Sequence, residues 1–369
     1  MQILITGGAG FIGSHLADEL MRRDHRVRVL DILSPQVHGE GCGRPEYLDP
    51  DVELQRGDVR DRDAVRRALE GVDIVYHLAA AVGVGQSMYE IEHYVSTNTV
   101  GTAVLLQQIV RQRVQRLVVA SSMSLYGEGL YADARGNRVE GTERGLEQLR
   151  AAEWEVRDVH GDILVPVATP ETKTSSLSSV YALSKFDQER LCLMIGRAYD
   201  IPTVALRFFN VFGTRQALSN PYTGVLAIFA ARLLNDRAPL IFEDGLQQRD
   251  FVSVHDVVQA CCLAMEVPEA AGHAFNVGSG RSYSVRQVAD MLGRVLHRDV
   301  APDVSGKYRV GDIRHCFADI TLARTVLGYE PAVMLEDGLD ELAAWLREQT
   351  AHDRVADASR ELATRGLTV

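Results

Sequence analysis

A tyrosine and a lysine four residues apart are the strongest candidates for acid–base chemistry in this sequence. Tyr181 and Lys185 begin a segment, 181–199, with helical spacing. Because residues i and i+4 lie on one face of a helix, Lys185 can stand beside the phenol and lower its pKa from about 10. A tyrosine tuned in this way can exchange a proton with a substrate hydroxyl. The spacing alone occurs often by chance, and the alternative is an amphipathic helix with an incidental Tyr and Lys.

Hydroxyl side chains at the end of an apolar strand offer further polar groups to the same site. Ser121 and Ser122 end the stretch 117–122, and Ser124 follows it. Ligands bind at the carboxyl ends of parallel strands, so Ser122 can hydrogen-bond the oxygen that Tyr181 protonates or deprotonates. The alternative for Ser122 is a hydrogen bond from the strand end to the backbone.

A glycine-rich loop near the N-terminus predicts a phosphate-binding turn. Gly7, Gly10 and Gly13 lie between a predicted strand, 2–6, and a predicted helix, 11–23. Glycines allow backbone N–H groups to approach a pyrophosphate, and the helix N-terminus adds favourable partial charge. Asp31 ends the next strand, where a carboxylate accepts hydrogen bonds from ribose hydroxyls and repels a 2′-phosphate. The pattern favours NAD over NADP, against the alternative of a tight turn with a surface Asp.

Alternating strands and helices must position these groups. The pattern predicts strands at 2–6, 27–31, 52–54, 74–78, 116–121 and 203–208, and helices at 11–23, 62–70, 99–112 and 181–199. Such alternation indicates a parallel sheet that is covered on both faces. Residues 128–178 are polar and lack a strong period, which predicts an irregular insertion. Residues 351–369 read as a polar tail or a weak terminal helix.

Composition excludes several classes of function. The chain has 39 Lys and Arg against 50 Asp and Glu, a net charge of −11, which argues against a nucleic-acid binder. No run of about 18 apolar residues is present, so no membrane span is expected. The N-terminus reads directly into a strand rather than a signal peptide. Five cysteines without a C-x-x-C motif favour neither disulfides nor a metal site, and a cytoplasmic location is expected.

At this point the sequence resembles the extended short-chain dehydrogenase/reductase family, in its NAD-dependent nucleotide-sugar epimerase/dehydratase branch. The motifs that carry the resemblance run in family order and cover most of residues 1–340: TGGAGFIGSH at 6–15, Asp31, GDVR at 57–60, HLAA at 77–80, NTVGT at 98–102, Ser121 and Ser122, Tyr181 to Lys185, and RFFNVFG at 207–213.

The resemblance implies an α/β fold: a Rossmann doubly wound parallel sheet with a smaller C-terminal substrate-binding α/β lobe. It implies an NAD-binding domain at 1–211, a nucleotide-sugar-binding lobe at 212–251 and 278–350, and a return to the first domain at 252–277. Tightly bound NAD is the implied cofactor. Its implied site comprises Gly7, Gly10, Phe11, Ile12, Gly13, Asp31, Ile32, Asp58, Val59, Leu78, Ala79, Ala80, Asn98, Ser121, Tyr181 and Lys185.

The resemblance also implies catalytic roles for Tyr181, Lys185 and Ser122, and a nucleotide-diphosphate sugar, dTDP- or UDP-linked, as the substrate. Arg249 and Arg309 match segments whose arginines grip the diphosphate, although each could instead form a surface ion pair. Leu240 and Phe242 offer an apolar shelf for a pyrimidine. The full implied substrate site is Val84, Ser122, Ser124, Asn210, Val225, Leu240, Phe242, Arg249 and Arg309.

The residues at 122–124 narrow the expected reaction. Dehydratases of this branch carry Thr-Asp-Glu there, whereas this chain has Ser122, Met123 and Ser124 and so lacks the acid that dehydration needs. The overall pattern resembles C4 epimerases. Three stretches, 80–89, 121–129 and 210–224, resemble bacterial dTDP-L-rhamnose 4-epimerases, which interconvert dTDP-L-rhamnose and dTDP-6-deoxy-L-talose.

Alternatives to that expectation are a UDP-glucose or other UDP-hexose 4-epimerase, a nucleotide-4-keto-6-deoxysugar reductase, and a non-catalytic NAD-sensing protein. The family further implies a homodimer built on helices near 99–112 and 181–199, whose apolar faces could equally belong to the core.

Overall fold

A parallel sheet of seven strands forms the centre of the computed structural model, which describes residues 1–368. The strand order is β14-β9-β5-β4-β1-β2-β3, so the direction of winding reverses between β1 and β4. This order is that of a doubly wound Rossmann sheet, which confirms the predicted fold class. The strands are β1 (Gln2–Thr6), β2 (Arg26–Asp31), β3 (Glu53–Arg56), β4 (Ile74–His77), β5 (Arg116–Ser122), β9 (Thr203–Phe208) and β14 (Ala274–Val277).

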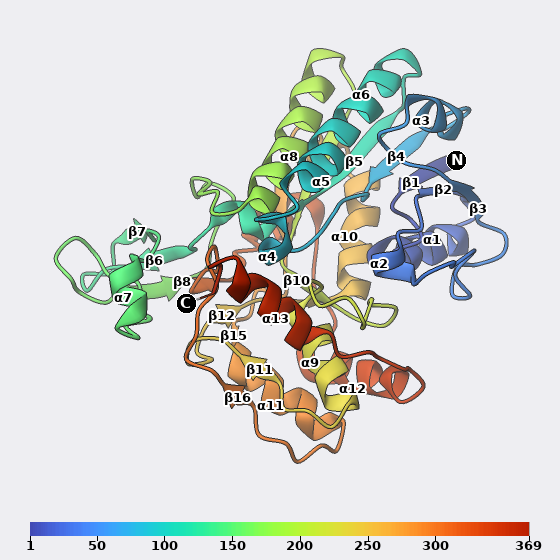
Figure 1. Ribbon diagram of the computed structural model, residues 1–369. Coiled ribbons are helices and arrows are strands. Elements are labelled where there is room, and N and C mark those ends of the chain that lie inside the picture. Colours follow the sequence, from blue (N-terminus) through green and yellow to red (C-terminus); the bar gives the residue numbers. More distant parts are fainter. Residues whose placement is uncertain (369) are drawn as a thin grey trace.

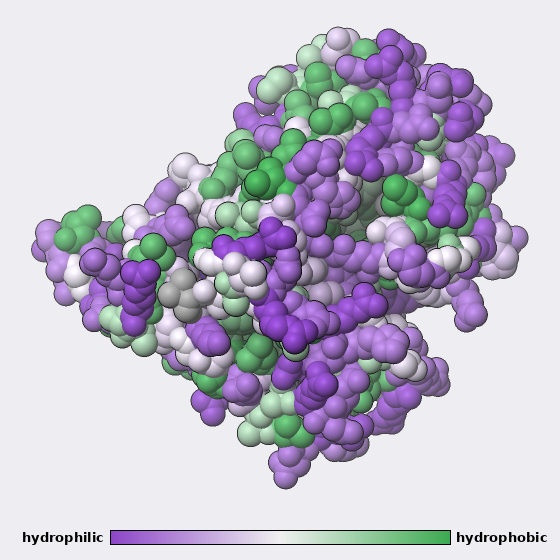
Figure 2. Space-filling model, viewed as in Figure 1, coloured by the Kyte–Doolittle hydropathy of each residue, from purple (hydrophilic) through white to green (hydrophobic). Residues whose placement is uncertain are grey.

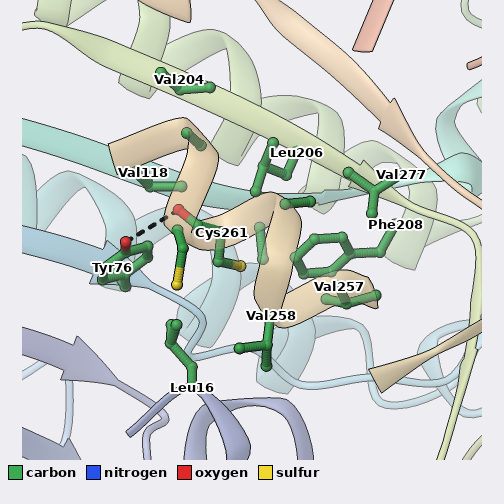
Figure 3. Packing of buried hydrophobic residues seen from close by; sticks show 14 of the residues in the cluster. Leu16, Tyr76, Val118, Val204, Leu206, Phe208, Val257, Val258, Cys261 and Val277 are labelled. Atoms are coloured by element: carbon green, nitrogen blue, oxygen red, sulfur yellow. Dashed lines mark hydrogen bonds between the residues drawn. The ribbon is translucent and has the colours of Figure 1, made fainter. Parts of the chain in front are cut away.

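Helices cover both faces of this sheet, as parallel strands require (Figure 1). One face packs on α1 (Phe11–Arg22) and α10 (Val254–Glu266). The other packs on α3 (Arg62–Ala68), α6 (Gly101–Arg111) and α8 (Val180–Ala198). Figure 3 shows Val257, Val258 and Cys261 of α10 against sheet side chains, where the Tyr76 hydroxyl donates a 3.0 Å hydrogen bond to the Cys261 carbonyl oxygen. A buried phenol is thereby satisfied within an apolar layer.

The smaller lobe packs three helices around a separate apolar cluster. These are α9 (Val225–Leu234), α11 (Val285–Val295) and α12 (Leu335–Leu346). Short strands connect them: β10 (Asn210–Phe212) pairs with β13 (Phe251–Ser253), and β11 (Leu240–Ile241) pairs with β16 (Asp303–Val304). Between β15 (Tyr283–Ser284) and β17 (His315–Cys316) lies β12 (Gln248–Arg249).

The segment 128–178 is more regular than its sequence suggests. It forms an antiparallel sheet of β7 (Arg138–Glu140), β6 (Leu130–Ala132) and β8 (Val165–Val167), with helix α7 (Leu146–Arg150). Each element has three to five residues, too few for a period to be visible in the sequence. A small cluster of Tyr131, Val156 and Leu164 is buried beneath them. Long-range packing therefore orders a segment that local pattern leaves undefined.

Residues near the C-terminus form a packed helix, α13 (Val355–Thr364), which crosses the front of the molecule between α4 and α9 (Figure 1). Short helices complete the fold: α2 (Pro35–His38), α4 (Val84–Ser87), α5 (Ile91–Tyr94), the π-helical turns η1 (Val95–Val100) and η4 (Ala323–Leu327), and the 3-10 turns η2 (Met123–Tyr126) and η3 (Pro268–Ala270). In the part of the chain described, no helix is both long and apolar enough to cross a membrane.

Candidate active site

One cavity of about 850 Å³ lies between the carboxyl ends of the central strands and the smaller lobe. Every residue predicted to bind cofactor or substrate or to act in catalysis lines it, with the exception of Asn98. The same cavity is thus bordered by the glycine loop, by residues 78–80 after β4, by residues 121–124 at the end of β5, and by Tyr181. The wall on the lobe side is formed by the predicted substrate residues Val84, Asn210, Val225, Leu240, Phe242, Arg249 and Arg309.

The glycine loop is packed so closely that side chains are excluded from it. A Cβ added at Gly13 would lie 2.6 Å from both the Gly7 carbonyl oxygen and the Gly8 Cα. A Cβ at Gly7, whose φ is +70°, would lie 2.8 Å from the Ala79 Cα. Helix α1 starts directly after this turn at Phe11, so its free N–H groups face the cavity. The loop is therefore a built cradle for a pyrophosphate.

Asp31 stands at the end of β2 with both carboxylate oxygens in use. Its Oδ2 accepts a hydrogen bond from the Ala9 N–H at 3.0 Å, and its Oδ1 accepts one from the Leu33 N–H at 2.9 Å. His38 approaches Oδ1 at 3.9 Å. The backbone bonds fix the carboxylate at the cavity wall, where its negative charge favours ribose hydroxyls and opposes a 2′-phosphate. The glycine cradle and this carboxylate together fit NAD.

Tyr181 lies in the first turn of α8, where two serines fix the backbone. The Ser179 hydroxyl caps the helix by accepting from the Ala182 N–H at 3.1 Å, and Ser87 accepts from the Tyr181 N–H at 3.0 Å. Desolvation raises the pKa of the Tyr181 phenol, while its hydrogen bond with the Ser122 hydroxyl acts in the opposite direction. The Ser122 Oγ also accepts from the Ser124 Oγ at 3.0 Å. Two hydroxyls and the phenol thus form one hydrogen-bonded group.

Lys185 lines the cavity one turn after Tyr181, and its ammonium has a partner three residues further along the same helix. Its Nζ donates to the Gln188 Oε1 at 2.7 Å, and burial lowers the pKa of Lys185 to about 8. Gln188 in turn donates to the Thr102 Oγ1 at 3.0 Å and lies 3.2 Å from the His77 Nε2. Burial and the charge of Lys185 lower the pKa of His77 to about 3, which keeps it neutral. Gln188 thus holds the Lys185 ammonium, and the effect of Lys185 on the pKa of the Tyr181 phenol stays a prediction.

The two arginines of the lobe wall are held by other groups rather than projecting freely. Arg249 donates to the carbonyl oxygens of Arg314 at 2.9 Å and Ile313 at 2.5 Å. The Arg309 guanidinium lies 4.6 Å from the centre of the Phe242 ring and donates to Asp312 at 2.9 Å. The Nδ2 of Asn210 is buried and has no hydrogen-bond partner among the described residues. This wall offers cations, an amide donor and an aromatic face, which suit a diphosphate and a base.

A buried ionic network supports this wall from behind. Arg314, whose exposed fraction is 0%, pairs with Glu155 at 2.5 Å, Asp244 at 2.6 Å and Glu243 at 2.9 Å. Arg144 of the insertion pairs with Glu243 at 2.9 Å. Because Arg314 also accepts from Arg249 through its carbonyl oxygen, the network joins the insertion to a cavity-lining arginine.

Asn98 is not among the residues that line the cavity, and its predicted place beside the cofactor stays a prediction. Its Oδ1 accepts from the Ala81 N–H at 2.7 Å, and its Nδ2 donates to the Ala81 carbonyl at 3.0 Å and the Ser184 Oγ at 2.9 Å. Both the amide oxygen and the amide nitrogen of Asn98 thus bond other parts of the chain. Asn98 therefore positions the segment after β4 and joins that segment to α8.

Sequence reasoning also missed residues of the cavity wall. His38, the last residue of the short helix α2, reaches the wall, and nothing in the local sequence indicated this. Val355, Ala358, Ser359 and Leu362 of α13 line the cavity as well. The spacing of Val355, Ala358 and Leu362 by three and four residues was a visible signal of one buried helix face. A cluster of three or more side chains suited to holding a metal is not found among residues 1–368.

Comparisons with known proteins agree with this geometry. The sequence profile described as NAD dependent epimerase/dehydratase family matches residues 3–148 and 158–278. A dTDP-L-rhamnose 4-epimerase of Burkholderia thailandensis is 35% identical over 352 residues, which cover 94% of this chain and 95% of the relative. A putative UDP-glucose 4-epimerase of Methanocaldococcus jannaschii is 30% identical, covering 94% of this chain and 98% of that relative.

Solved structures show the same arrangement of the fold. The UDP-glucose 4-epimerase of Thermotoga maritima, crystallised with UDP-glucose, is 32% identical with a TM-score of 0.78, covering 94% of this chain and 99% of that chain. The UDP-glucuronic acid 4-epimerase of Bacillus cereus, in complex with UDP-glucuronic acid and NAD, is 27% identical with a TM-score of 0.77 over the same shares.

Proposed function

This chain belongs to the NAD dependent epimerase/dehydratase family, and we propose that it inverts C4 of the sugar in dTDP-L-rhamnose to give dTDP-6-deoxy-L-talose, and the reverse. It is an enzyme of the NAD-dependent nucleotide-sugar epimerase type. The observation that carries the proposal is that Tyr181, Ser122, the glycine loop, Arg249 and Arg309 all line the same cavity of about 850 Å³.

The chain supplies proton transfer and positioning for this reaction. Tyr181 takes the proton from the C4 hydroxyl, and Ser122 holds the same oxygen by a hydrogen bond. Bound in the glycine cradle beside Asp31, NAD would supply the reversible hydride acceptor that oxidation and re-reduction at C4 need. The glycine cradle and Asp31 hold the dinucleotide, while Arg249 and Arg309 hold the diphosphate of the sugar nucleotide. The sugar, anchored only through its diphosphate, then turns within the cavity before Tyr181 returns the proton.

The residues around the phenol support epimerisation over dehydration. Ser122 and Ser124 donate and accept hydrogen bonds near Tyr181, and Met123 between them is apolar and buried. A hydroxyl is a poor acid, so this strand end offers no carboxyl group to protonate a departing hydroxyl. In this proposal Tyr181 is the one group that exchanges a proton with the C4 hydroxyl, and Ser122 holds that hydroxyl by a hydrogen bond.

A second candidate is the C4 epimerisation of a UDP-hexose. It is favoured by the Thermotoga structure, which is named for that activity and shares 32% identity with this chain. The dTDP-sugar is preferred because the relative with 35% identity over 94% of this chain carries that name. Both reactions use the same phenol and the same cofactor, so the two candidates differ in the sugar and base that the cavity selects.

The test is to incubate purified protein with dTDP-L-rhamnose or with UDP-glucose, without added cofactor, and to follow the C4 configuration by NMR. We expect a mixture of C4 epimers from dTDP-L-rhamnose, formed about tenfold or more faster than from UDP-glucose. A faster reaction with UDP-glucose would replace the first candidate by the second. Release of a keto sugar with stoichiometric NADH would overturn both.

A homodimer is part of this proposal. Helix α8 carries the exposed apolar side chains Leu183 and Met194, and η1, which leads into α6, carries Val95 and Val100. Figure 2 shows green, apolar residues on the end of the molecule where α6 and α8 lie. Apolar patches of this kind mark contacts between proteins. Two copies that join these helices would form a four-helix contact, and light scattering would detect the doubled mass.

A further inference from the structure

The C-terminal segment is fastened to the lobe on both sides of α13. Before the helix, Asp353 pairs with Arg237 at 3.0 Å and its side chain is only 2% exposed. The Ala351 carbonyl accepts from the Asn235 Nδ2 at 2.8 Å. After the helix, the Leu367 carbonyl accepts from the Val310 N–H at 3.0 Å. The helix is thus a fixed part of the molecule rather than a trailing end.

One face of α13 is apolar and forms part of the cavity wall. Val355, Ala358 and Leu362 are buried and line the cavity, together with Ser359. Charged side chains such as Asp357 and Arg360 lie on the exposed face, which Figure 2 shows as hydrophilic. The division of the helix into two faces therefore places three apolar side chains and the Ser359 hydroxyl against the ligand space, and charged side chains against solvent.

The contacts of α13 place it at the sugar end of the cavity. Leu362 lies across from Gly85 of α4, where an added Cβ would come within 3.4 Å of the Leu362 Cδ2. Helix α4 also holds the catalytic residue, because the Ser87 Oγ accepts from the Tyr181 N–H at 3.0 Å. Arg365 lies 4.4 Å from the centre of the Tyr89 ring and fastens the helix to the segment that follows α4. Leu362 and Val84 thus border the corner of the cavity next to the reacting hydroxyl.

We propose that this corner selects the C6 methyl group of a 6-deoxy sugar and that Leu362 is a specificity-determining residue. The inference rests on the proposed function, since the methyl group distinguishes rhamnose and 6-deoxytalose from common hexoses. Carbon C6 is bonded to C5, the neighbour of the reacting C4, so a sugar whose C4 hydroxyl meets Tyr181 carries its C6 close by.

The chemistry of the corner accounts for the preference. Burying a methyl group against Leu362 and Val84 is favourable because it removes apolar surface from water. A C6 hydroxyl or carboxylate placed there would lose its hydrogen bonds to water, and neither Leu362 nor Val84 can replace them. The corner therefore favours binding of the 6-deoxy sugar over binding of a sugar that carries oxygen at C6.

The test compares Leu362→Ser with Ala363→Ser, which introduces the same hydroxyl on the exposed face of the same turn. We expect Leu362→Ser to raise the KM for dTDP-L-rhamnose about tenfold. Its dissociation constant for dTDP, which lacks the sugar, should match that of the wild type. Ala363→Ser should leave both values unchanged.

An equal loss of affinity for dTDP and for dTDP-L-rhamnose would overturn the inference, because the effect would then not arise at the sugar. An unchanged KM for dTDP-L-rhamnose would overturn it too. Should Leu362→Ser not fold, as judged by its melting temperature, Ala358→Ser adds the same hydroxyl to the same wall with a smaller change of side-chain volume, and should raise the same KM about threefold. Failure of the proposed function is seen separately, as wild-type protein that does not epimerise dTDP-L-rhamnose.

Discussion

The two walls of the cavity are built in different ways. On the cofactor side, backbone N–H groups and small residues make the surface, and the missing Cβ of Gly13 is what allows the loop to close. On the substrate side, long side chains make the surface, and their positions depend on ions buried behind them, with Arg314 fully enclosed. The first wall is specified within one strand–loop–helix unit, whereas the second is assembled from segments far apart in the sequence.

This difference predicts which kind of substitution disrupts each wall. A backbone cradle is sensitive to any added side chain but contains few charges that could be left unpaired. A wall of buried ions is sensitive to the loss of a single partner, because the remaining charges stay desolvated. Damage to the cofactor wall should therefore appear as lost NAD, and damage to the substrate wall as lost stability.

The largest effect is expected from Arg314→Met, which keeps much of the side-chain volume but leaves Glu155, Glu243 and Asp244 without their shared cation. We expect the free energy of unfolding to fall by about 4 kcal/mol, measured by urea denaturation. Arg298→Met is the control, since its ion pair with Asp236 at 2.8 Å is exposed and should contribute below about 1 kcal/mol. Equal losses in the two variants would contradict the distinction between the walls.

Tyr181→Phe tests the point where the walls meet. It removes the group that exchanges the proton but leaves both walls intact, so kcat should fall on the order of a thousandfold while bound NAD and stability stay at wild-type values. The assay is epimerisation of dTDP-L-rhamnose, with NAD content measured after denaturing the protein. Tyr199→Phe, at the exposed end of the same helix, should keep full activity. Unchanged turnover in Tyr181→Phe would remove the phenol from the mechanism.

Gly13→Ala tests the cofactor wall. Its Cβ would meet the Gly7 carbonyl oxygen and the Gly8 Cα at 2.6 Å, and backbone at both contacts cannot move aside cheaply. We expect the affinity for NAD to fall about a hundredfold, close to the 2.7 kcal/mol that such a factor represents. Gly145→Ala, where an added Cβ meets nothing within 4 Å, should bind NAD normally. Full NAD content in Gly13→Ala would show that the loop is not the cradle.

The smallest effect is a pH dependence confined to the substrate wall. Hydrogen bonds from His315 and Arg314 lower the pKa of Glu155 from 4.5 to about 2. Because the folded state holds the ionised form, the stabilisation by Glu155 is fully present above pH 4.5 and is lost as the pH falls toward about 2.

Glu155→Gln removes this titration, so the stability difference between wild type and variant should shrink as the pH falls from 4.5 toward about 2 in urea titrations, the window set by that pKa shift. Glu153→Gln, at an exposed neighbouring position, serves as the control and should show no such change. A difference for Glu155→Gln that is constant with pH would contradict the assigned ion pairs.

Much of the fold could be predicted from sequence because its signals are local. The strands and helices of the central sheet follow apolar runs and spacings that are complete within each element, and the structure confirms them. The glycine loop and the Tyr181 to Lys185 spacing are likewise short-range features. The pattern failed where a segment has no period of its own, as in 128–178, whose elements of three to five residues are ordered by contacts with the lobe.

The candidate site was harder to predict where a side chain had several possible partners. The Asn98 amide bonds Ala81 and Ser184, which lie on two other segments, so spacing along the chain cannot reveal these partners. The Lys185 Nζ donates to Gln188, which lies three residues further along the same helix and on the same face. The roles of Asn98 and Lys185 toward the cofactor and the phenol stay predictions.

The sequence by itself determined the class of chemistry: a phenol and an ammonium one turn apart, and a glycine turn that excludes side chains, are properties of adjacent residues. Tertiary structure alone decided what surrounds that chemistry. It buried Arg314 among carboxylates from two distant segments, 155 and 243–244, and laid α13 across the cavity beside Gly85. The physical reason is that a helix or loop is specified by neighbours in the chain, whereas a cavity wall is specified by packing and charge pairing between segments that meet only when the chain has folded.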